Sequence, residues 1–379
     1  MANNNKHTGP NVPALRFPEF SGEWIESKLG DIADFSKGAG ISKDQRSEEG
    51  NPCILYGELY TRYKSEVITN VFSKTALPDS ELVKSKSNDI IIPASGETAE
   101  DIATARCVPF DNILLGGDLN IIRLHEQDGK FFSYQLNGVR KYNIATVAQG
   151  VSVVHLHAGD LKGITVKYPS HIAEQEKISQ ILGLIDDRIA TQSKIIEEQE
   201  TLLKSLADSL ISSQVANMAL NDCVVARSST MKESELENPG PFPVFGASGL
   251  CGYSNEALEE SDSILVTKDG SGVGTCQYAT GAHSFLGTLC SLTAKYGVYL
   301  PYVYYALLNF NFASFKTGLA IPHIYFKDYG KAVIYCPAYD EQVRIASGLE
   351  KLEAKINTDK ELLKQYQLQK EYLLSRMFI

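Results

Sequence analysis

The sequence predicts an α+β protein built as an internal two-fold repeat, with two globular domains of mixed strands and helices and two long helices that pair as a coiled coil. Three observations support this fold class. Two long stretches carry apolar side chains at alternating spacings of three and four residues, which is typical of helices with one buried stripe. The segment before each stretch occurs twice in the chain. Short apolar runs separated by Gly, Asn and Asp fill the rest and indicate strands and turns.

The first long helix is expected within residues 170–216, which carry 4 basic and 8 acidic side chains. A single apolar stripe has to be buried against a partner, so this helix requires a second one. Its predicted stripe is apolar except at two glutamines and consists of Ile178, Leu182, Ile185, Ile189, Gln192, Ile196, Gln199, Leu203, Leu206 and Leu210.

The second long helix is expected within residues 338–379. Adding 167 to each position of the first stripe gives Ile345, Leu349, Leu352, Ile356, Asp359, Leu363, Tyr366, Lys370, Leu373 and Met377. The polar position Gln192 recurs as Asp359, and we favour the interpretation that these polar residues fix the register of the pair over one in which the helices splay apart there. Parallel and antiparallel pairing both satisfy the two stripes.

A repeated segment leads into each helix. Residues 149–169 align with residues 317–337 at an offset of 168, which matches Gly150 with Gly318 and His155 with His323. Upstream, LGDI matches LNDC at an offset of 191, and Tyr56-Gly57 is matched with Phe245-Gly246 at 189. The offset changes inside the globular parts and is constant at their exits, as expected for two copies that diverge in loops. The predicted domains are residues 1–169 and 217–337, with the helices at 170–216 and 338–379.

Secondary structure within the globular parts follows from local pattern. Strands are expected at Ile90–Ile92, Ile113–Leu115, Asn120–Leu124 and Ile164–Tyr168, and again at Ser263–Thr267, Gly274–Tyr278 and Lys331–Cys336. Residues 301–308 are predicted to be helical. Near the N-terminus, Phe17, Phe20 and Trp24 are expected to hold the chain against the first domain.

Composition restricts the function classes. The net charge of −10 and the absence of a strongly basic segment mean that nucleic acid would have to be bound through local patches. The seven cysteines form no C-x-x-C pair, which favours reduced thiols and a cytoplasmic location. Neither a signal peptide nor a membrane-spanning apolar run is evident, so no membrane partner is expected.

Motifs for chemistry are weak. The glycine-rich run DGSGVG at Asp269–Gly274 lacks the G-K-[ST] ending of a P-loop, so a hairpin turn is predicted, although its amides and Lys268 could approach a phosphate. His155 and His157 would share one face of a strand, but no third ligand stands at a familiar spacing, and no metal site is predicted. No nucleophile with its base is evident. The chain is therefore predicted to be non-catalytic.

Several segments resemble the DNA-specificity subunits of type I restriction–modification systems. RFPEFSGEW at Arg16–Trp24, followed by KLGDI, is similar to the family's proximal segment, and PVFGASGLCGY at Pro243–Tyr253 is similar to the opening of a target-recognition domain. The helix entry, a proline followed by EQ and then I-x-x-x-L, occurs at Pro169–Leu182 and again at Pro337–Leu349. The second copy has no aromatic counterpart of Arg16–Trp24.

This resemblance implies a DNA-binding subunit of a restriction system. Each target-recognition domain would read one half of a bipartite double-stranded DNA site, and the helices would set the spacer and dock two methyltransferase subunits, through which restriction (translocase) subunits join the DNA methylation complex. S-adenosylmethionine, ATP and Mg²⁺ would be used by those partners, with no cofactor in this chain. Candidate DNA contacts are polar and basic loop residues that can reach phosphates or base edges: Lys37, Lys43, Arg46, Arg62, Lys64, Arg106, Gln149, Ser248, Lys268, Ser271, Lys316 and His323.

Two alternatives remain at this point. One is a coiled-coil scaffold whose two globular domains bind protein or glycan without DNA specificity, which salt-dependent and site-specific DNA binding would exclude. The other is a type II-like enzyme with fused recognition domains, which the missing catalytic motifs disfavour.

Overall fold

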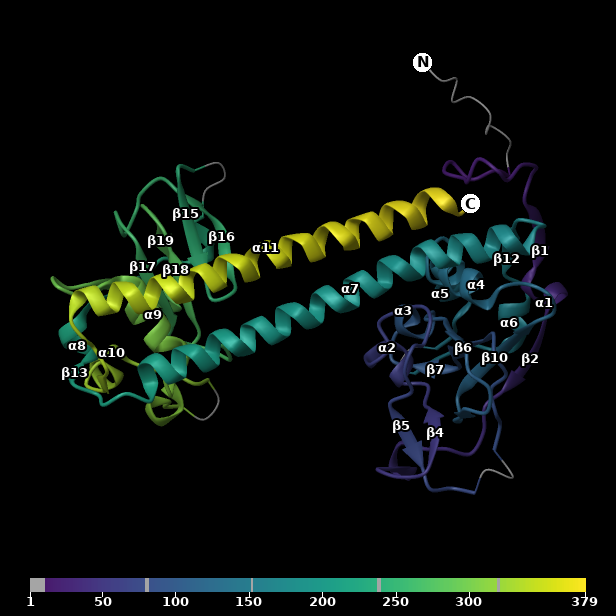
Figure 1. Cartoon of the computed structure of the whole chain (residues 1–379), viewed down its shortest axis with the longest axis horizontal. Coiled ribbons are helices and arrows are strands. Elements are labelled where there is room, and N and C mark those ends of the chain that lie inside the picture. Colours follow the sequence, from purple (N-terminus) through teal and green to yellow (C-terminus); the bar gives the residue numbers. More distant parts are fainter. Residues whose placement is uncertain (1–10, 79–81, 151–152, 237–239, 319–320) are drawn as a thin grey trace, which may run out of the picture. The chain divides into compact units, whose positions relative to one another are not determined.

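The computed structural model describes residues 11–78, 82–150, 153–236, 240–318 and 321–379. The chain forms two compact units, which we call unit 1 and unit 2. Unit 1 comprises residues 1–191 together with Leu362–Ile379, and unit 2 comprises Gln192–Glu361. Each unit thus combines a globular part with one section of each long helix (Figure 1).

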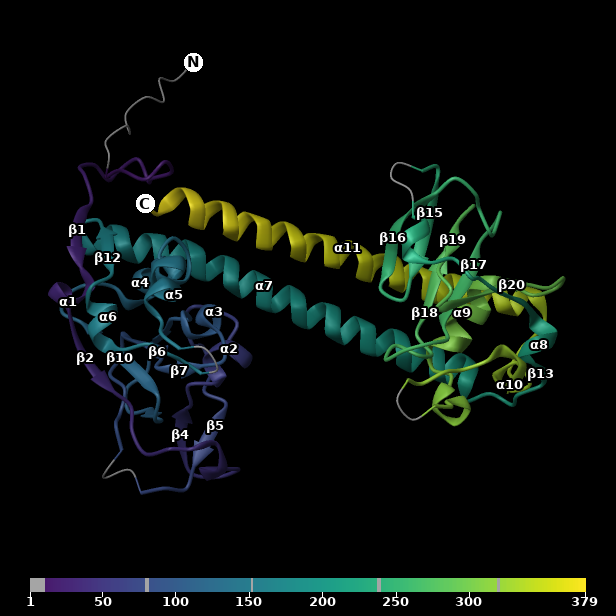
Figure 2. The same ribbon diagram turned by 180° about the vertical axis from the view of Figure 1, so that it is seen from behind.

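Unit 1 is an α+β structure around a four-stranded antiparallel sheet in the order β2-β10-β6-β8. A second sheet, in the order β3-β5-β4-β9, lies at the end of the unit remote from α7, and two strand pairs, β1-β12 and β11-β7, complete it (Figure 2). Its elements are β1 (Ile25–Lys28), α1 (Leu29–Ile32), β2 (Ala33–Lys37), a 3-10 turn (Lys43–Gln45), β3 (Arg46–Ser47), β4 (Asn51–Ile54), α2 (Glu58–Thr61), β5 (Ser73–Thr75), β6 (Asp89–Pro93), β7 (Ser95–Gly96), α3 (Ala99–Ile102), β8 (Arg106–Val108), β9 (Leu114–Leu115), β10 (Leu119–Leu124), α4 (Gly129–Asn137), α5 (Lys141–Val147), β11 (Val154–His155), α6 (Ala158–Lys162) and β12 (Thr165–Tyr168).

Unit 2 has the same plan, with a four-stranded antiparallel sheet in the order β14-β20-β17-β18. The sheet β16-β15-β19 and the pair β13-β21 take the places of the smaller sheets. Its elements are β13 (Met218–Ala219), α8 (Leu220–Cys223), β14 (Val224–Ser228), a 3-10 turn (Glu233–Glu235), β15 (Phe242–Gly246), β16 (Gly249–Ser254), β17 (Ser263–Thr267), β18 (Cys276–Ala279), β19 (Ser284–Phe285), β20 (Leu289–Ala294), α9 (Leu300–Leu308), a 3-10 turn (Phe312–Phe315), α10 (Phe326–Tyr329) and β21 (Val333–Ile334).

The predicted repeat is confirmed by topology and register. In both copies a strand of the smaller sheet runs parallel to a short later strand, and Ile54 pairs with Leu115 as Phe245 pairs with Phe285. Ile54 and Phe245 are therefore equivalent, at the same offset of 191 that relates LGDI to LNDC. The predicted match of Tyr56-Gly57 with Phe245-Gly246, at an offset of 189, is consequently wrong by two residues. The slip arose because a Tyr/Phe-Gly pair carries little positional information in loops of different length.

The long helices are α7 (Ile172–Ala207), which ends in a π-helical turn at Asp208–Ser212, and α11 (Tyr339–Met377). Within unit 1 they are antiparallel, because Lys370 contacts Asp186 whereas the earlier Tyr366 lies 5.9 Å from the later Arg188. Within unit 2, Gln199 Nε2 donates to Asp359 Oδ2 over 2.9 Å, and Lys360 pairs with Glu200 at 2.6 Å. The polar positions of the stripes therefore meet.

Burial supports both stripes except at one end. Ile178, Leu182 and Leu203 are buried, and so is most of the second stripe, but Leu206 and Leu210 are 38% and 41% exposed. Ala207 and Ile211 are buried in their place. An α-helix drifts by about 20° per heptad against a strict 3.5-residue repeat. Four heptads separate Ile178 from Leu206, so the accumulated drift is close to the 100° by which neighbouring residues differ around the helix. The buried face therefore passes from Leu206 to the next residue, Ala207.

A glutamine anchors the entry of each long helix. Gln175 donates from Nε2 to the Pro169 carbonyl and accepts from the N–H of Asp128, the residue that caps α4. Gln342 donates in the same way to the Pro337 carbonyl and accepts from the N–H of Tyr299 before α9. The repeated EQ thus ties the start of each long helix to the helix of the globular part that packs on it.

The preceding glutamates have different surroundings. Glu174 is buried, and its carboxylate forms an ion pair with the Arg16 guanidinium at 2.7 Å. The same carboxylate accepts a hydrogen bond from the indole N–H of Trp24 at 3.4 Å. Trp24 is 2% exposed and makes edge contacts with Phe131 and Phe378. The expected attachment of the N-terminal segment through Trp24 is therefore confirmed. In the second copy, which has no aromatic counterpart of Arg16–Trp24, Glu341 pairs with Arg344 of its own helix.

No helix among the described residues combines the length and the apolarity needed to cross a membrane.

Candidate nucleic-acid interface

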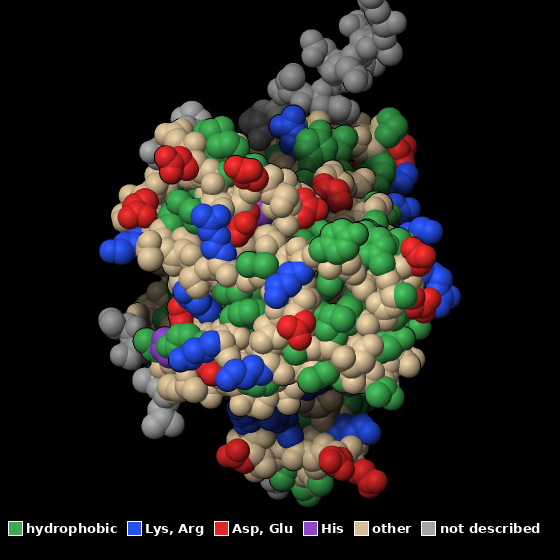
Figure 3. All heavy atoms as spheres, turned by 90° about the vertical axis from the view of Figure 1, so that its left-hand side faces the viewer, with side chains coloured by type: hydrophobic (Ala, Val, Ile, Leu, Met, Phe, Trp, Pro, Cys, Tyr) green, Lys and Arg blue, Asp and Glu red, His purple; other side chains and the backbone are tan. Residues whose placement is uncertain are grey.

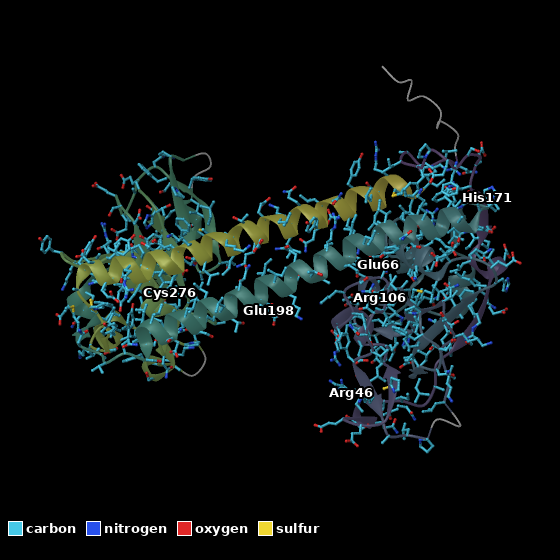
Figure 4. The ribbon with its side chains drawn as sticks, in the orientation of Figure 1. Arg46, Glu66, Arg106, His171, Glu198 and Cys276 are labelled. Carbon is cyan, nitrogen blue, oxygen red and sulfur yellow. The ribbon has the colours of Figure 1, made fainter. Side chains whose placement is uncertain are left out.

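A groove of about 1060 Å³ opens in the globular part of unit 1 and brings three of the predicted contacts together. Lys43, Arg46 and Arg62 line it and come from the turn before β3, from β3 itself and from the end of α2. The two tyrosines Tyr56 and Tyr60 also line it. Figure 4 shows Arg46 at the end of unit 1 that is remote from α7.

The charge of this groove is mixed. Five acidic residues line it beside the three basic ones: Asp44, Glu58, Glu97, Asp101 and Asp118. Such a surface does not bind every polyanion strongly, because each carboxylate repels a phosphate as each cation attracts one. It favours a ligand whose donors and acceptors match at defined positions.

Glu58 also lines the groove, and its side chain is 6% exposed. Its carboxylate accepts the Leu55 backbone N–H at 3.2 Å and the Ser73 hydroxyl. It also faces Arg62 at 3.2 Å and Arg46 at 3.9 Å. A buried carboxylate that is fixed by neutral donors in this way orients the guanidinium groups beside it.

Arg62 is held on two sides. Its guanidinium carbon lies 4.7 Å from the centre of the Phe72 ring, and Phe72 is 51% exposed. Sequence reasoning missed both Glu58 and Phe72, because it looked for basic and polar loop residues. An acidic residue four positions before an arginine, at helical spacing, was the available signal.

The other basic candidates of unit 1 divide into exposed and buried. Lys37 at the end of β2, Lys64 after α2, and Gln149 are exposed. Arg106, by contrast, is 8% exposed, donates to the carbonyls of Tyr63 and Ala105, and has its pKa lowered by burial. The structure therefore corrects the assignment of Arg106, which is a core residue of β8; a lone arginine in an apolar strand carries too little pattern to reveal this. Figure 4 shows it inside unit 1 near Glu66.

In unit 2 the candidates gather around the glycine-rich run. DGSGVG is the hairpin turn between the antiparallel strands β17 and β18, as predicted, with Gly270 and Gly274 at φ +96° and +91°. His323 joins it, because its Nδ1 lies 2.6 Å from Asp269 Oδ1 and the two residues form a β-bridge. Lys268 is half-buried and Ser271 is exposed on the same turn.

The two remaining candidates of unit 2 are exposed and lie elsewhere. Ser248 occupies the turn between β15 and β16, and Lys316 follows the 3-10 turn at Phe312–Phe315. In the space-filling view, acidic, basic and apolar side chains are interspersed over the visible face of unit 2 (Figure 3). The structure thus brings Asp269, Ser271 and His323 together, and it offers small polar clusters in place of a broad basic surface.

The repeated histidines share a backbone role. His155 exchanges backbone hydrogen bonds with Gln149, and His323 does so with Thr317. Within the described ranges, no group of three His, Cys, Asp or Glu side chains is arranged to hold a metal ion.

Comparison with known proteins agrees with this architecture. The family described as "Type I restriction modification DNA specificity domain" matches residues 21–201 and 213–366, one match for each copy of the repeat. A Mycoplasma pneumoniae protein named "Putative type I specificity subunit" is 23% identical over 226 residues. That match covers 50% of this chain and 59% of the relative, so the chain spans less than two thirds of that protein's length.

Solved structures show the same fold. The S subunit of a type I restriction–modification system from M. genitalium matches with a TM-score of 0.70 at 21% identity, over 97% of this chain and 99% of that one. A chain from a structural study of complex assembly and conformational transition of the type I R-M system matches with a TM-score of 0.54 at 13% identity, over 94% and 97% of the two chains. With both copies matched by the family, the chain belongs to the type I restriction–modification DNA specificity family.

Proposed function

We propose that this chain is the DNA-recognition subunit of a type I restriction–modification complex, in which each globular part reads one half of a bipartite double-stranded site. The observation that carries the proposal is the duplication. One strand order, β2-β10-β6-β8 and β14-β20-β17-β18, presents two different sets of polar loops. An unchanged scaffold with two loop sets suits two readers with different base preferences.

Catalysis is assigned to partner subunits in this proposal. Two methyltransferase subunits would supply S-adenosylmethionine chemistry, and restriction subunits that join through them would use ATP and Mg²⁺. The purified chain alone is expected to transfer no labelled methyl group and to cut no DNA, and activity of either kind would contradict this assignment.

A docking surface for partner subunits is available on α7. Within unit 2, Ile195, Leu202 and Leu206 follow one another at spacings of seven and four and are 36%, 49% and 38% exposed. An exposed apolar stripe on a helix marks a protein contact more readily than a DNA contact. We propose that this stripe meets a methyltransferase subunit, and that the helices set the spacer between half-sites.

The test of the function is an exchange of one reader. Residues 217–337 are replaced by the equivalent region of another specificity subunit, and the methylated motif is mapped by single-molecule sequencing with the methyltransferase subunits present. One half of the motif should change and the other should stay. A change in both halves, or in neither, would refute the two-reader proposal. The unmodified complex serves as the control.

A further inference from the structure

Arg62 combines two properties that surface arginines seldom share. Its side chain is 43% exposed at the groove, yet its Nη1 is held by Glu58 at 3.2 Å and by Ser73 Oγ at 3.4 Å. An exposed ion pair usually contributes little, because two long side chains have to be ordered in water. Here the carboxylate is already fixed and buried, so most of that ordering falls on Arg62 alone.

The free edge of this guanidinium is oriented. Among the described residues, hydrogen-bond partners are found only for Nη1 of Arg62, which leaves the N–H groups of Nη2 and Nε unused. The Phe72 ring at 4.7 Å lies against the guanidinium and restricts its rotation. Two parallel donors on a pre-oriented planar group match the O6 and N7 acceptors of guanine in the major groove.

Charge supports the same ligand. Glu58 faces both Arg46 and Arg62, so one carboxylate offsets only one of two guanidinium charges and the cluster keeps a net positive charge. The nearby carboxylates of Glu97 and Asp101 work against close binding of a phosphate. A base edge offers acceptors without a full negative charge, and it suits this setting better than the DNA backbone does.

We propose that Arg62 reads a guanine in the half-site recognised by unit 1, with Glu58 as the residue that positions it. This inference rests on the proposed function of the chain and deepens it, since it names one base and one side chain. Phe72 supplies the face against which the guanidinium is held.

The experiment uses the complete complex, with the full chain and its methyltransferase subunits, on a plasmid library in which the unit 1 half-site is randomised. Methylation is read by single-molecule sequencing for the wild type, Arg62→Ala, Arg62→Lys and Glu58→Gln. Lys64→Ala is the matched control, because it removes a neighbouring exposed charge for which the described part of the chain shows a single hydrogen bond, to the Thr61 carbonyl at 3.5 Å.

Arg62→Ala should lower the preference for guanine at one position by about 5- to 150-fold, the usual value of a bidentate arginine–guanine contact. Arg62→Lys keeps the charge and loses the fork, so it should bind DNA and still lose that preference. Glu58→Gln should weaken the preference less. Lys64→Ala should leave the motif unchanged and lower methylation of all sequences alike.

Two results would overturn the proposal in distinguishable ways. If Arg62→Ala and Arg62→Lys reduce methylation of every sequence equally while the motif stays the same, Arg62 contacts phosphate; the inference is then wrong and the proposed function stands. If the wild-type complex methylates every sequence of the randomised half-site alike, the proposed function of unit 1 itself fails and the inference fails with it.

Discussion

Lys370→Leu should strongly destabilise unit 1, because it removes the cation that two poorly exposed carboxylates share. The Lys370 ammonium lies 2.5 Å from Glu66 and 2.6 Å from Asp186, and the side chains are only 15%, 11% and 9% exposed. Tyr134 donates to the same Asp186 carboxylate over 2.7 Å. Burial opposes the charge of Lys370, but the two carboxylates outweigh it and raise its pKa. The cluster therefore keeps Lys370 charged between the two carboxyl groups.

The magnitude follows from what the substitution leaves behind. Removing one partner of a buried ion pair costs about 3–5 kcal/mol, because the remaining charge stays buried without compensation. Here two carboxylates would remain, and the buried Arg106 near them offsets part of the loss, which places the expected effect at about 3 kcal/mol. Leucine itself fits the stripe, since the equivalent position in the first helix is Leu203.

The chain reports on unit 1 with a single fluorophore. Trp24 is the one tryptophan in the sequence and is buried in the core of unit 1, so its fluorescence during urea unfolding follows that unit. With a denaturant slope of about 1–3 kcal/mol per M, the midpoint should fall by about 1–3 M. The double variant Lys370→Leu, Glu66→Gln leaves one carboxylate, Asp186, beside the buried Arg106 guanidinium, so it should recover most of the loss. An unchanged midpoint for Lys370→Leu, or a double variant no more stable than the single one, would refute the reasoning.

Three further predictions concern stability. Arg16→Ala leaves the buried Glu174 carboxylate without its guanidinium partner and should lower the free energy of unfolding by about 3–5 kcal/mol, as followed by Trp24 fluorescence. Arg344→Ala breaks an exposed ion pair and should leave the midpoint of urea unfolding, followed by circular dichroism, almost unchanged. Gly150→Ala should destabilise unit 1 by more than about 1 kcal/mol, because φ at Gly150 is +131° and a Cβ there would lie 2.0 Å from the backbone oxygen of Val153. Gly159→Ala should be neutral or slightly stabilising in the same urea assay, because a Cβ at this position in α6 meets open space. Hydrogen bonds from Lys355 and from Gln199 lower the pKa of Asp359 in the folded chain. Asp359 therefore stabilises the fold at pH values above its ordinary pKa of about 4, and this stabilisation is lost as the pH falls through the lowered pKa of the folded state. Asp359→Asn should therefore make acid unfolding less steep.

The elements that repeat at a fixed offset were the ones that sequence could predict. The stripes and the EQ entries lie on long helices, where one residue of error would turn the apolar face away from its partner, so the pattern is strict. The end of the first stripe departed from prediction because a 3.5-residue repeat was extrapolated over four heptads into a helix that keeps nearer 3.6. A buried stripe can therefore be predicted from sequence only over the length in which the assumed number of residues per turn is accurate.

The candidate site was less predictable for a different reason. Arg62 and Arg46 were found as basic loop residues, but their roles depend on Glu58, whose burial follows from the fold of β4 and α2. Arg106 was misassigned because the same residue type can donate to buried carbonyls. Charge and polarity in a sequence identify groups that can bind DNA, and only the fold shows which of them already have partners.

The two copies also show how the globular parts are attached to the helices. Tyr134 of α4 donates to Asp186 of α7, and Tyr305 of α9 donates to Glu353 of α11 over 2.7 Å in both cases. The offsets of these pairs, 171 and 167, are those of the surrounding elements, so the contact is the same one in each copy.

The charge of the acidic partner is compensated differently in each copy. In unit 1 the ammonium group of Lys370 pairs with Asp186. In unit 2 the position equivalent to Lys370 is Leu203, and the hydroxyl of Tyr304 donates instead to the second oxygen of Glu353 at 3.1 Å. A tyrosine whose pKa is raised by burial and by a neighbouring carboxylate stays protonated and remains a donor. The shared tyrosine–acid hydrogen bond therefore orients each globular part on its own section of a long helix, while the groups that compensate the acid differ between the two copies. An exchanged globular part that lacks the equivalent of Tyr305 would leave one oxygen of the Glu353 carboxylate without its donor, and it should fold less well for that reason alone.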